Sequence, residues 1–232
     1  FVDGLRRMGL ANRTDIMIPG EATPTMRNPG EKGWSGVSLP WMSIGYEVAL
    51  TPLQVLTFYN AVANNGRLMQ PQFVDHVSRN GKTTERFEPK ELNPAICSKA
   101  TLDIVHGFLQ GVVDSGTATN LKNAHFAIAG KTGTAQIARN GSYKSEGLSY
   151  QASFVGYFPA DAPKYSCIVV VNGPTMSGVY GNVVAGPVFK EIADKIYSNR
   201  LELQQETHLA AAEGPRTPIS MSGHSGDLRT AL

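Results

Sequence analysis

Apolar residues recur at helical spacing in three parts of the chain. The first helix is predicted to begin at Thr51-Pro52-Leu53-Gln54, where Thr51 can cap it, Pro52 suits its first position and Gln54 completes a capping box. It is predicted to end at Asn64-Asn65-Gly66. A second helix is predicted between Ser98 and Gly116, and a third is signalled by Pro187. Their apolar stripes, which we interpret as packed faces, are Leu53, Leu56, Tyr59 and Val62; Leu102, Val105, Leu109 and Val112; and Val184, Val188, Ile192 and Ile196.

Between the second and third helices, three apolar runs are typical of strands, at residues 126–136, 151–158 and 165–171. Residues 139–150 are rich in Gly, Ser, Lys and Glu and are predicted to form a surface loop. The two prolines of residues 159–163 favour a short reversal. Three successive strands imply an antiparallel sheet, so we predict an α/β fold of the α+β type, in which helices flank that sheet.

Other segments carry weaker signals. Asn80-Gly81 predicts a tight hairpin turn between strand-like runs at residues 73–77 and 83–87. Residues 30–45 contain prolines and tryptophans without a period, and we interpret them as a packed loop. After Tyr197 the sequence is at most weakly helical and then rich in Pro, Gly, Ser and Thr, which predicts disorder. We therefore expect a folded part at residues 1–198 and a tail at 199–232.

Composition bounds the classes of function. The 232 residues are 41% hydrophobic and 17% charged, enough for one sizeable core. With 21 basic and 19 acidic residues the net charge is +2, and no basic stripe predicts nucleic-acid binding. No run approaches the length of a membrane span, and no signal peptide is recognisable. Cys97 and Cys167 are interpreted as free thiols, Cys167 within a buried strand. The five histidines are dispersed, so no metal site is expected.

The candidate chemistry lies in Lys131-Thr132-Gly133-Thr134, which follows the apolar start of the first predicted strand. Lys131 supplies a positive charge, Thr132 and Thr134 supply hydroxyl donors, and Gly133 removes a side chain where a ligand backbone must come close. Such a strand can lie along a peptide with an anionic end, with its backbone free for sheet-like pairing. We name these four residues the box and predict that they form a binding edge.

Three residues of the type Lys-Thr-Gly are a weak signal alone, because an exposed strand end with a turn glycine has the same composition. A phosphate-binding P-loop is the other reading, but it needs a glycine where His125 stands. A side chain there obstructs the backbone cradle, so a nucleotide site is disfavoured.

The chain resembles the transpeptidase domain of class B penicillin-binding proteins, most closely the division-type (septal) enzymes that cross-link peptidoglycan. The box is one of three motifs of that family. The resemblance covers about residues 1–198 and runs through Ile18-Pro19-Gly20-Glu21, Met42-Ser43-Ile44-Gly45-Tyr46, Leu50-Thr51-Pro52-Leu53-Gln54, residues 61–66, residues 152–159 and Ala185-Gly186-Pro187-Val188-Phe189.

The resemblance implies a role for each residue of the box. The strand would pair with the D-Ala-D-Ala end of a peptidoglycan stem peptide, Thr132 and Thr134 would hold its terminal carboxylate, and Lys131 would act electrostatically. The backbone amide of Thr134 would be one oxyanion-hole donor. The implied reaction is serine acyl transfer, with β-lactams stalling at the acyl-enzyme. It requires no metal or organic cofactor. The implied location is the periplasmic, extracytoplasmic face, with an inner-membrane anchor outside this sequence and cell-division proteins as partners.

The family's other two motifs are Ser-x-x-Lys, with the nucleophile, and Ser-x-Asn. No lysine of the chain has a serine three positions before it, and Ser78-Arg79-Asn80 falls on the predicted hairpin, where we interpret it as a chance match. We therefore expect a fragment that is inactive alone. Two alternatives stay open: a penicillin-recognising relative such as a β-lactamase, carboxypeptidase or sensor, and a nucleophile-free binding or scaffolding module.

Overall fold

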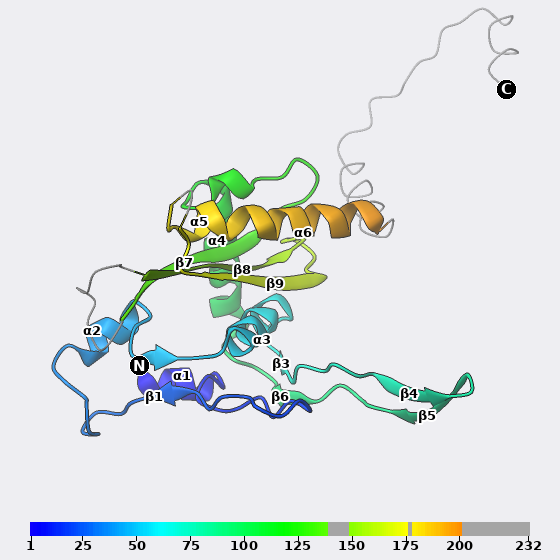
Figure 1. The fold of residues 1–232 in the computed structure, drawn as a ribbon, viewed down its shortest axis with the longest axis horizontal. Coiled ribbons are helices and arrows are strands. Elements are labelled where there is room, and N and C mark those ends of the chain that lie inside the picture. Colours follow the sequence, from blue (N-terminus) through cyan, green and yellow to red (C-terminus); the bar gives the residue numbers. More distant parts are fainter. Residues whose placement is uncertain (139–148, 176–177, 201–232) are drawn as a thin grey trace, which may run out of the picture. The chain divides into compact units, whose positions relative to one another are not determined.

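The computed structural model describes residues 1–138, 149–175 and 178–200 (Figure 1). The chain divides into two units, Phe1–Ala193 and Asp194–Leu232, and of the second only residues 194–200 are described. Most of the predicted tail and residues 139–148 of the predicted loop thus lie outside the described residues. The boundary at residue 198 stays a prediction.

A three-stranded antiparallel sheet is the centre of the first unit (Figure 1). Its strands, in spatial order, are β7 (Ala129–Ile137), β8 (Ser149–Phe158) and β9 (Tyr165–Asn172). All three predicted strands are confirmed, although β7 begins at Ala129 and not at residue 126, and β8 includes the last two residues of the predicted loop. The register places Gly133 of β7 opposite Ser153 of β8.

Helices cover both faces of this sheet. On one face, Tyr157 of β8 is fully buried in a core shared with α3 (Pro52–Ala63) and α4 (Lys99–Asp114). Side chains alternate between faces along a strand, so Phe154 and Phe158 point to the opposite face. There the Phe189 ring of α6 (Gly186–Asn199) lies 4.8 Å from the Phe154 ring, centre to centre. Helices on both faces of an antiparallel sheet confirm the predicted fold class.

The apolar stripe predicted for the last helix is wrong at Val188 and Ile192. This segment forms two helices, α5 (Gly181–Val184) and α6, and the buried positions of α6 are Gly186, Phe189 and Ala193. Val188 and Ile192 of the predicted stripe are 44% and 36% exposed. The Phe189 ring fills the space above Phe154 and Phe158, and a side chain at Gly186 would collide with Leu121. Packing of one large ring therefore sets the rotation of α6 and leaves Val188 and Ile192 exposed, while Val184 and Ile196 of the predicted stripe are half-buried.

The predicted start and end of α3 are confirmed. The Gln54 N–H donates to Thr51 Oγ1 at 3.2 Å, and the Thr51 N–H donates to Gln54 Oε1 at 2.8 Å, which is a complete capping box. Its predicted core stripe is only partly right, because Val62 is buried while Leu53, Leu56 and Tyr59 are half-buried. Gln54 and Thr57 are buried instead, because their polar atoms have hydrogen-bond partners.

The helix α4 likewise has a capping residue at its start and a buried apolar stripe. The Ser98 Oγ accepts a hydrogen bond from the Thr101 N–H at 3.2 Å, as the sequence predicts. Leu102, Leu109 and Val113 are buried, and the predicted Val105 and Val112 are half-buried. The turn η1 (Thr119–Leu121) follows the helix.

Losing the Thr51 cap is expected to cost the chain about 1 kcal/mol of unfolding free energy in the variant Thr51→Ala. Urea denaturation followed by circular dichroism measures this loss. Thr51→Ser keeps the hydroxyl acceptor and is the matched control, expected within a few tenths of a kcal/mol of wild type. Equal losses in both variants would show that the methyl group, and not the cap, matters.

The segment before the sheet consists of short elements. They are α1 (Val2–Arg7), α2 (Ser38–Ser43), β1 (Thr25–Met26) paired with β2 (Val48–Ala49), and β3 (Leu68–Met69) paired with β6 (Glu91–Asn93). The helix α2 corrects the interpretation of residues 30–45 as loop throughout. It forms where the buried Ser38 Oγ accepts the Ser35 N–H at 3.0 Å.

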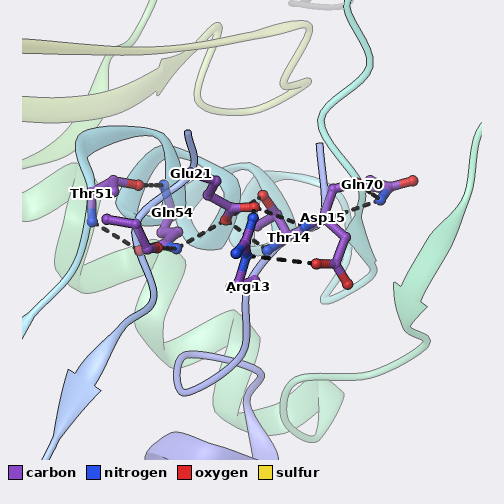
Figure 2. Close-up of polar contacts among 8 residues, drawn as sticks. Arg13, Thr14, Asp15, Glu21, Thr51, Gln54 and Gln70 are labelled. Carbon is purple, nitrogen blue, oxygen red and sulfur yellow. Dashed lines mark hydrogen bonds and ion pairs between the residues drawn. The ribbon is translucent and has the colours of Figure 1, made fainter. Parts of the chain in front are cut away.

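Glu21 joins residues 14 and 15 to the start of α3 through one carboxylate (Figure 2). Its side chain is only 3% exposed. Oε1 accepts the Thr14 N–H at 2.7 Å, the Thr14 hydroxyl at 2.9 Å and Gln54 Nε2 at 2.9 Å, while Oε2 accepts the Asp15 N–H at 2.9 Å. Burial alone would raise the pKa of Glu21, but these hydrogen bonds outweigh it and lower the pKa to about 2. The ionised carboxylate therefore fastens residues 14–21 to the start of α3.

The hairpin of β4 (His76–Arg79) and β5 (Lys82–Arg86) confirms the turn predicted at Asn80-Gly81. Both turn residues have positive φ, 52° and 74°, which is the geometry that favours Asn-Gly. Every residue of the two strands is exposed. Ser78-Arg79-Asn80 therefore belongs to this hairpin, in line with its interpretation as a chance match.

Cys97 and Cys167 are free thiols and half-buried, and burial raises the pKa of Cys167.

Among the described residues no helix has the length and apolar character needed to cross a bilayer.

Candidate functional site

The box forms the middle of β7, so all four residues predicted for the site are adjacent on one strand. Lys131 and Thr134 are exposed, and Thr132 and Gly133 are half-buried. Within the described part of the chain β7 pairs with β8 alone, which leaves its other edge open. An open edge presents unpaired backbone donors and acceptors to a ligand.

The direction of these backbone groups follows from a contact at the end of β7. The Gln136 N–H donates to the Tyr46 hydroxyl at 3.1 Å and so points away from β8. Alternate residues of an antiparallel strand direct N–H and C=O to the same side. The register is regular from residue 129 to 137, so the N–H and C=O of Thr132 and Thr134 also point to the open edge. A contact of Lys131 supports this direction of the Thr132 carbonyl, because the Lys131 Nζ donates to that carbonyl oxygen at 2.9 Å.

The two box hydroxyls lie on the face that α5 and α6 cover. Thr132 is opposite Phe154, whose ring contacts Phe189, and Thr134 has the same parity along the strand. Each hydroxyl has a partner from outside the strand. The Thr117 and Thr132 hydroxyl oxygens are 3.0 Å apart, and the Gly181 N–H donates to Thr134 Oγ1 at 3.1 Å.

Gly133 has a structural reason to be glycine in addition to the one expected from the sequence. A Cβ at this position would collide with the Ser153 hydroxyl of the facing strand. The absent side chain thus allows β7 and β8 to pair closely beside the two threonines. A matched requirement exists at Gly130, where a Cβ would collide with the Val155 carbonyl and the Phe154 ring.

The arrangement offers a distinct set of contacts to an extended ligand. The outward N–H and C=O of Thr132 and Thr134 can form the ladder of a further strand. The hydroxyls of the same two residues can donate to an anionic group, and the Lys131 ammonium supplies the compensating charge. All of these groups come from one strand edge and need no conformational rearrangement of the sheet.

A cavity of about 590 Å³ lies elsewhere, between α1, α3, β3 and β6, and none of the box residues line it. Its walls include Arg6, Arg7 and Arg13 together with apolar Leu68 and Leu92. The enclosed cavity and the box are therefore in different parts of the fold. We place the site at the box because an edge strand binds its ligand on an open surface. In the part of the chain that the structure describes, no three His, Cys, Asp or Glu residues gather as metal ligands would.

Sequence reasoning missed three residues that support the box: Tyr46, Thr117 and Gly181. Thr117 follows the predicted end of the second helix at Gly116 and carries no motif, and neither does Gly181. They are 15 and 47 residues from their partners, and no local period reports a contact over such a distance. Tyr46 lies in one of the stretches of family resemblance, but nothing in that stretch indicates a hydrogen bond to the end of β7.

An open strand edge with a lysine, two oriented hydroxyls and outward backbone groups is the geometry expected of a strand that binds an extended peptide with an anionic end. Residues 1–194 match the family model of the penicillin binding protein transpeptidase domain, and the chain belongs to this family. Its resemblance to class B penicillin-binding proteins is thereby confirmed, and PbpB and PBP3 relatives are consistent with the division type.

Among curated proteins, the chain is 31% identical over 205 residues to penicillin-binding protein PbpB of Mycolicibacterium smegmatis, covering 83% of this chain and 31% of that protein. It is 31% identical over 192 residues to the probable peptidoglycan D,D-transpeptidase PenA of Neisseria gonorrhoeae, covering 82% and 30%. The chain thus spans about a third of the length of these relatives.

Among solved structures, penicillin-binding protein 3 of Mycobacterium tuberculosis complexed with ampicillin is similar, with a TM-score of 0.74 and 27% identity over 96% of this chain and 49% of that one. The apo form gives a TM-score of 0.72 and 29% identity over 85% and 45%.

Proposed function

We propose that this chain is part of a serine-type peptidoglycan D,D-transpeptidase and that the box binds the D-Ala-D-Ala end of a stem peptide. The folded part, residues 1–198, would then be the C-terminal portion of the transpeptidase domain. The observation that carries the proposal is the open edge of β7, where two threonine hydroxyls and two outward backbone amides lie beside the Lys131 ammonium. The named D,D-transpeptidase relative supports the reaction class.

Each group of the box has a part in substrate binding. The stem peptide extends along β7 and pairs with the outward N–H and C=O groups of Thr132 and Thr134. Its terminal carboxylate accepts hydrogen bonds from the two threonine hydroxyls, which point to one face of the strand. Lys131 leaves the Thr132 carbonyl, which the ligand backbone takes over, and its ammonium moves toward the reacting groups.

The chemistry would be acyl transfer to a serine of the Ser-x-x-Lys motif. The serine oxygen attacks the penultimate D-Ala carbonyl, the peptide C–N bond breaks and D-Ala leaves as the amine. An amine of a neighbouring stem then attacks the ester and releases the serine. The Thr134 N–H, which faces the open edge, is suited to stabilise the oxyanion of both steps. A β-lactam enters the same path and stops at the ester.

We also propose the setting in which the parent protein acts. Its substrate is cell-wall peptide, so the domain would lie on the periplasmic, extracytoplasmic face, anchored to the inner membrane by a segment outside this sequence. Division proteins would be its partners, in agreement with the PbpB and PBP3 relatives.

Covalent labelling tests the proposed function. The full natural protein that contains this chain should be labelled by a fluorescent penicillin and, after digestion, carry the label on a serine of a Ser-x-x-Lys motif. The 232-residue chain alone should stay unlabelled, because it contains no such motif. Release of hydrolysed penicillin at many turnovers would instead indicate a β-lactamase, and absence of label from the natural protein would favour a binding module.

A further inference from the structure

The two box hydroxyls are the only side chains of the proposed carboxylate clamp, and both are held by groups that the proposed mechanism does not use. Thr117 Oγ1 lies 3.0 Å from Thr132 Oγ1, and the Gly181 N–H donates to Thr134 Oγ1 at 3.1 Å. A hydroxyl group can donate one hydrogen and accept two. What these partners donate or accept therefore decides what the box hydroxyls can offer a ligand.

Thr134 shows the principle without ambiguity. An amide N–H can only donate, so Thr134 Oγ1 is the acceptor in its contact with Gly181. The hydroxyl hydrogen of Thr134 is left to donate elsewhere. A carboxylate can only accept, so a Thr134 hydroxyl prepared in this way is suited to bind one.

Gly181 reaches this position because nothing covers the strand backbone there. Gly133 and Ser153 face each other, and a Cβ at Gly133 would meet the Ser153 hydroxyl, on the face opposite to the threonines. On the threonine face the backbone of this pair is bare. Gly181 packs directly on it, and a Cβ at Gly181 would collide with the Ser153 carbonyl. Glycine is therefore required at position 181 for its amide to reach Thr134.

Thr117 is fixed by its neighbours although its own side chain is exposed. The Gly116 N–H donates to the Gly111 carbonyl at 2.9 Å and the Ala118 N–H to the Val112 carbonyl at 2.9 Å, at the end of α4. Ala118 is fully buried. The backbone on both sides of Thr117 is thereby tied to the helix, which holds its side chain beside Thr132 before a ligand binds and lowers the ordering cost of binding.

We infer that Thr117 is a positioning residue that donates its hydroxyl hydrogen to Thr132 and so leaves Thr132 free to donate to the ligand carboxylate, as the Gly181 amide does for Thr134. Both hydroxyls of the clamp are then prepared as donors before the ligand arrives. This inference rests on the proposed function and adds to it a residue outside the box. Thr117 does not touch the substrate and acts through Thr132.

The test compares acylation rates of the full natural protein by a penicillin. Thr117→Val removes the hydroxyl with little change of shape. It is expected to slow acylation about tenfold, which is the effect of weakening one hydrogen bond from Thr132 to the charged carboxylate of the ligand. Thr117→Ser keeps the hydroxyl and is the matched control, expected within about twofold of wild type. Melting temperatures of both variants should equal that of wild type, because the side chain is exposed.

A double-mutant cycle separates positioning from a general structural effect. In a Thr132→Val background the substitution Thr117→Val should add less than about twofold, because the residue through which Thr117 acts is absent. A full tenfold further loss in that background, or an unchanged rate in Thr117→Val alone, overturns the inference while wild-type labelling still supports the proposed function. Absence of acylation in the wild-type protein overturns both.

Discussion

Replacing Lys131 by alanine in the full natural protein is expected to slow acylation by penicillin at least about a hundredfold while leaving the fold intact. Lys131 is exposed and its Nζ donates to the edge carbonyl of Thr132, so its loss removes little packing. It does remove the only cation of the box from a site that we propose holds a carboxylate and stabilises an oxyanion. Time-resolved labelling with a fluorescent penicillin measures the rate.

Two controls sharpen this experiment. Lys122→Ala changes an exposed lysine away from β7 and should label like wild type. Lys131→Arg keeps the charge but presents a planar guanidinium in place of a compact ammonium, and its rate should stay well below that of wild type. Undiminished labelling in Lys131→Ala would remove Lys131 from the proposed mechanism, although not β7 from the binding edge.

Loss of the Glu21 carboxylate is expected to destabilise the folded protein, because its two oxygens accept four hydrogen bonds there. The pKa of Glu21 falls from 4.5 to about 2 in the folded protein, which corresponds to about 3 kcal/mol of stabilisation. In Glu21→Gln the side-chain NH₂ would replace one acceptor and face N–H donors of Thr14 or Asp15. The variant should lose stability of that order in urea denaturation at neutral pH.

The pH dependence has a definite sign. A folded-state pKa below the unfolded value means that the ionised carboxylate stabilises the fold. The contribution is fully present above about pH 5 and is lost as the pH falls through 4.5 toward 2. Wild type should therefore lose stability over this range, and Glu21→Gln should lose much less. Glu88→Gln is the matched control, because Glu88 is exposed, and it should follow the wild-type curve.

The local features of this chain were predictable from sequence because they depend on neighbouring residues. The α3 capping box involves residues three apart, the hairpin depends on Asn80-Gly81, and the box lies on one strand whose apolar start marks it. For the same reason Lys131, Thr132, Gly133 and Thr134 could be named without a structure. Short-range hydrogen bonding and strand alternation contain that information.

Long-range packing set the features that the sequence did not indicate. The stripe of Val184, Val188, Ile192 and Ile196 has helical spacing, yet the Phe189 ring decides which side of α6 meets the sheet. In α3 the polar Gln54 is buried because Glu21 and the Ala22 carbonyl, more than 30 residues away, accept hydrogen bonds from its amide. The supports of the box, Thr117 and Gly181, depend likewise on partners that only the fold brings together.

The β4–β5 hairpin offers a practical handle on the protein. Its strands are exposed along their whole length and its turn consists of Asn80 and Gly81, so a change at the turn meets no packed side chain. A fluorophore or a short epitope inserted between these two residues would leave the β7 edge untouched. The tagged molecule would then show where the protein resides in a living cell.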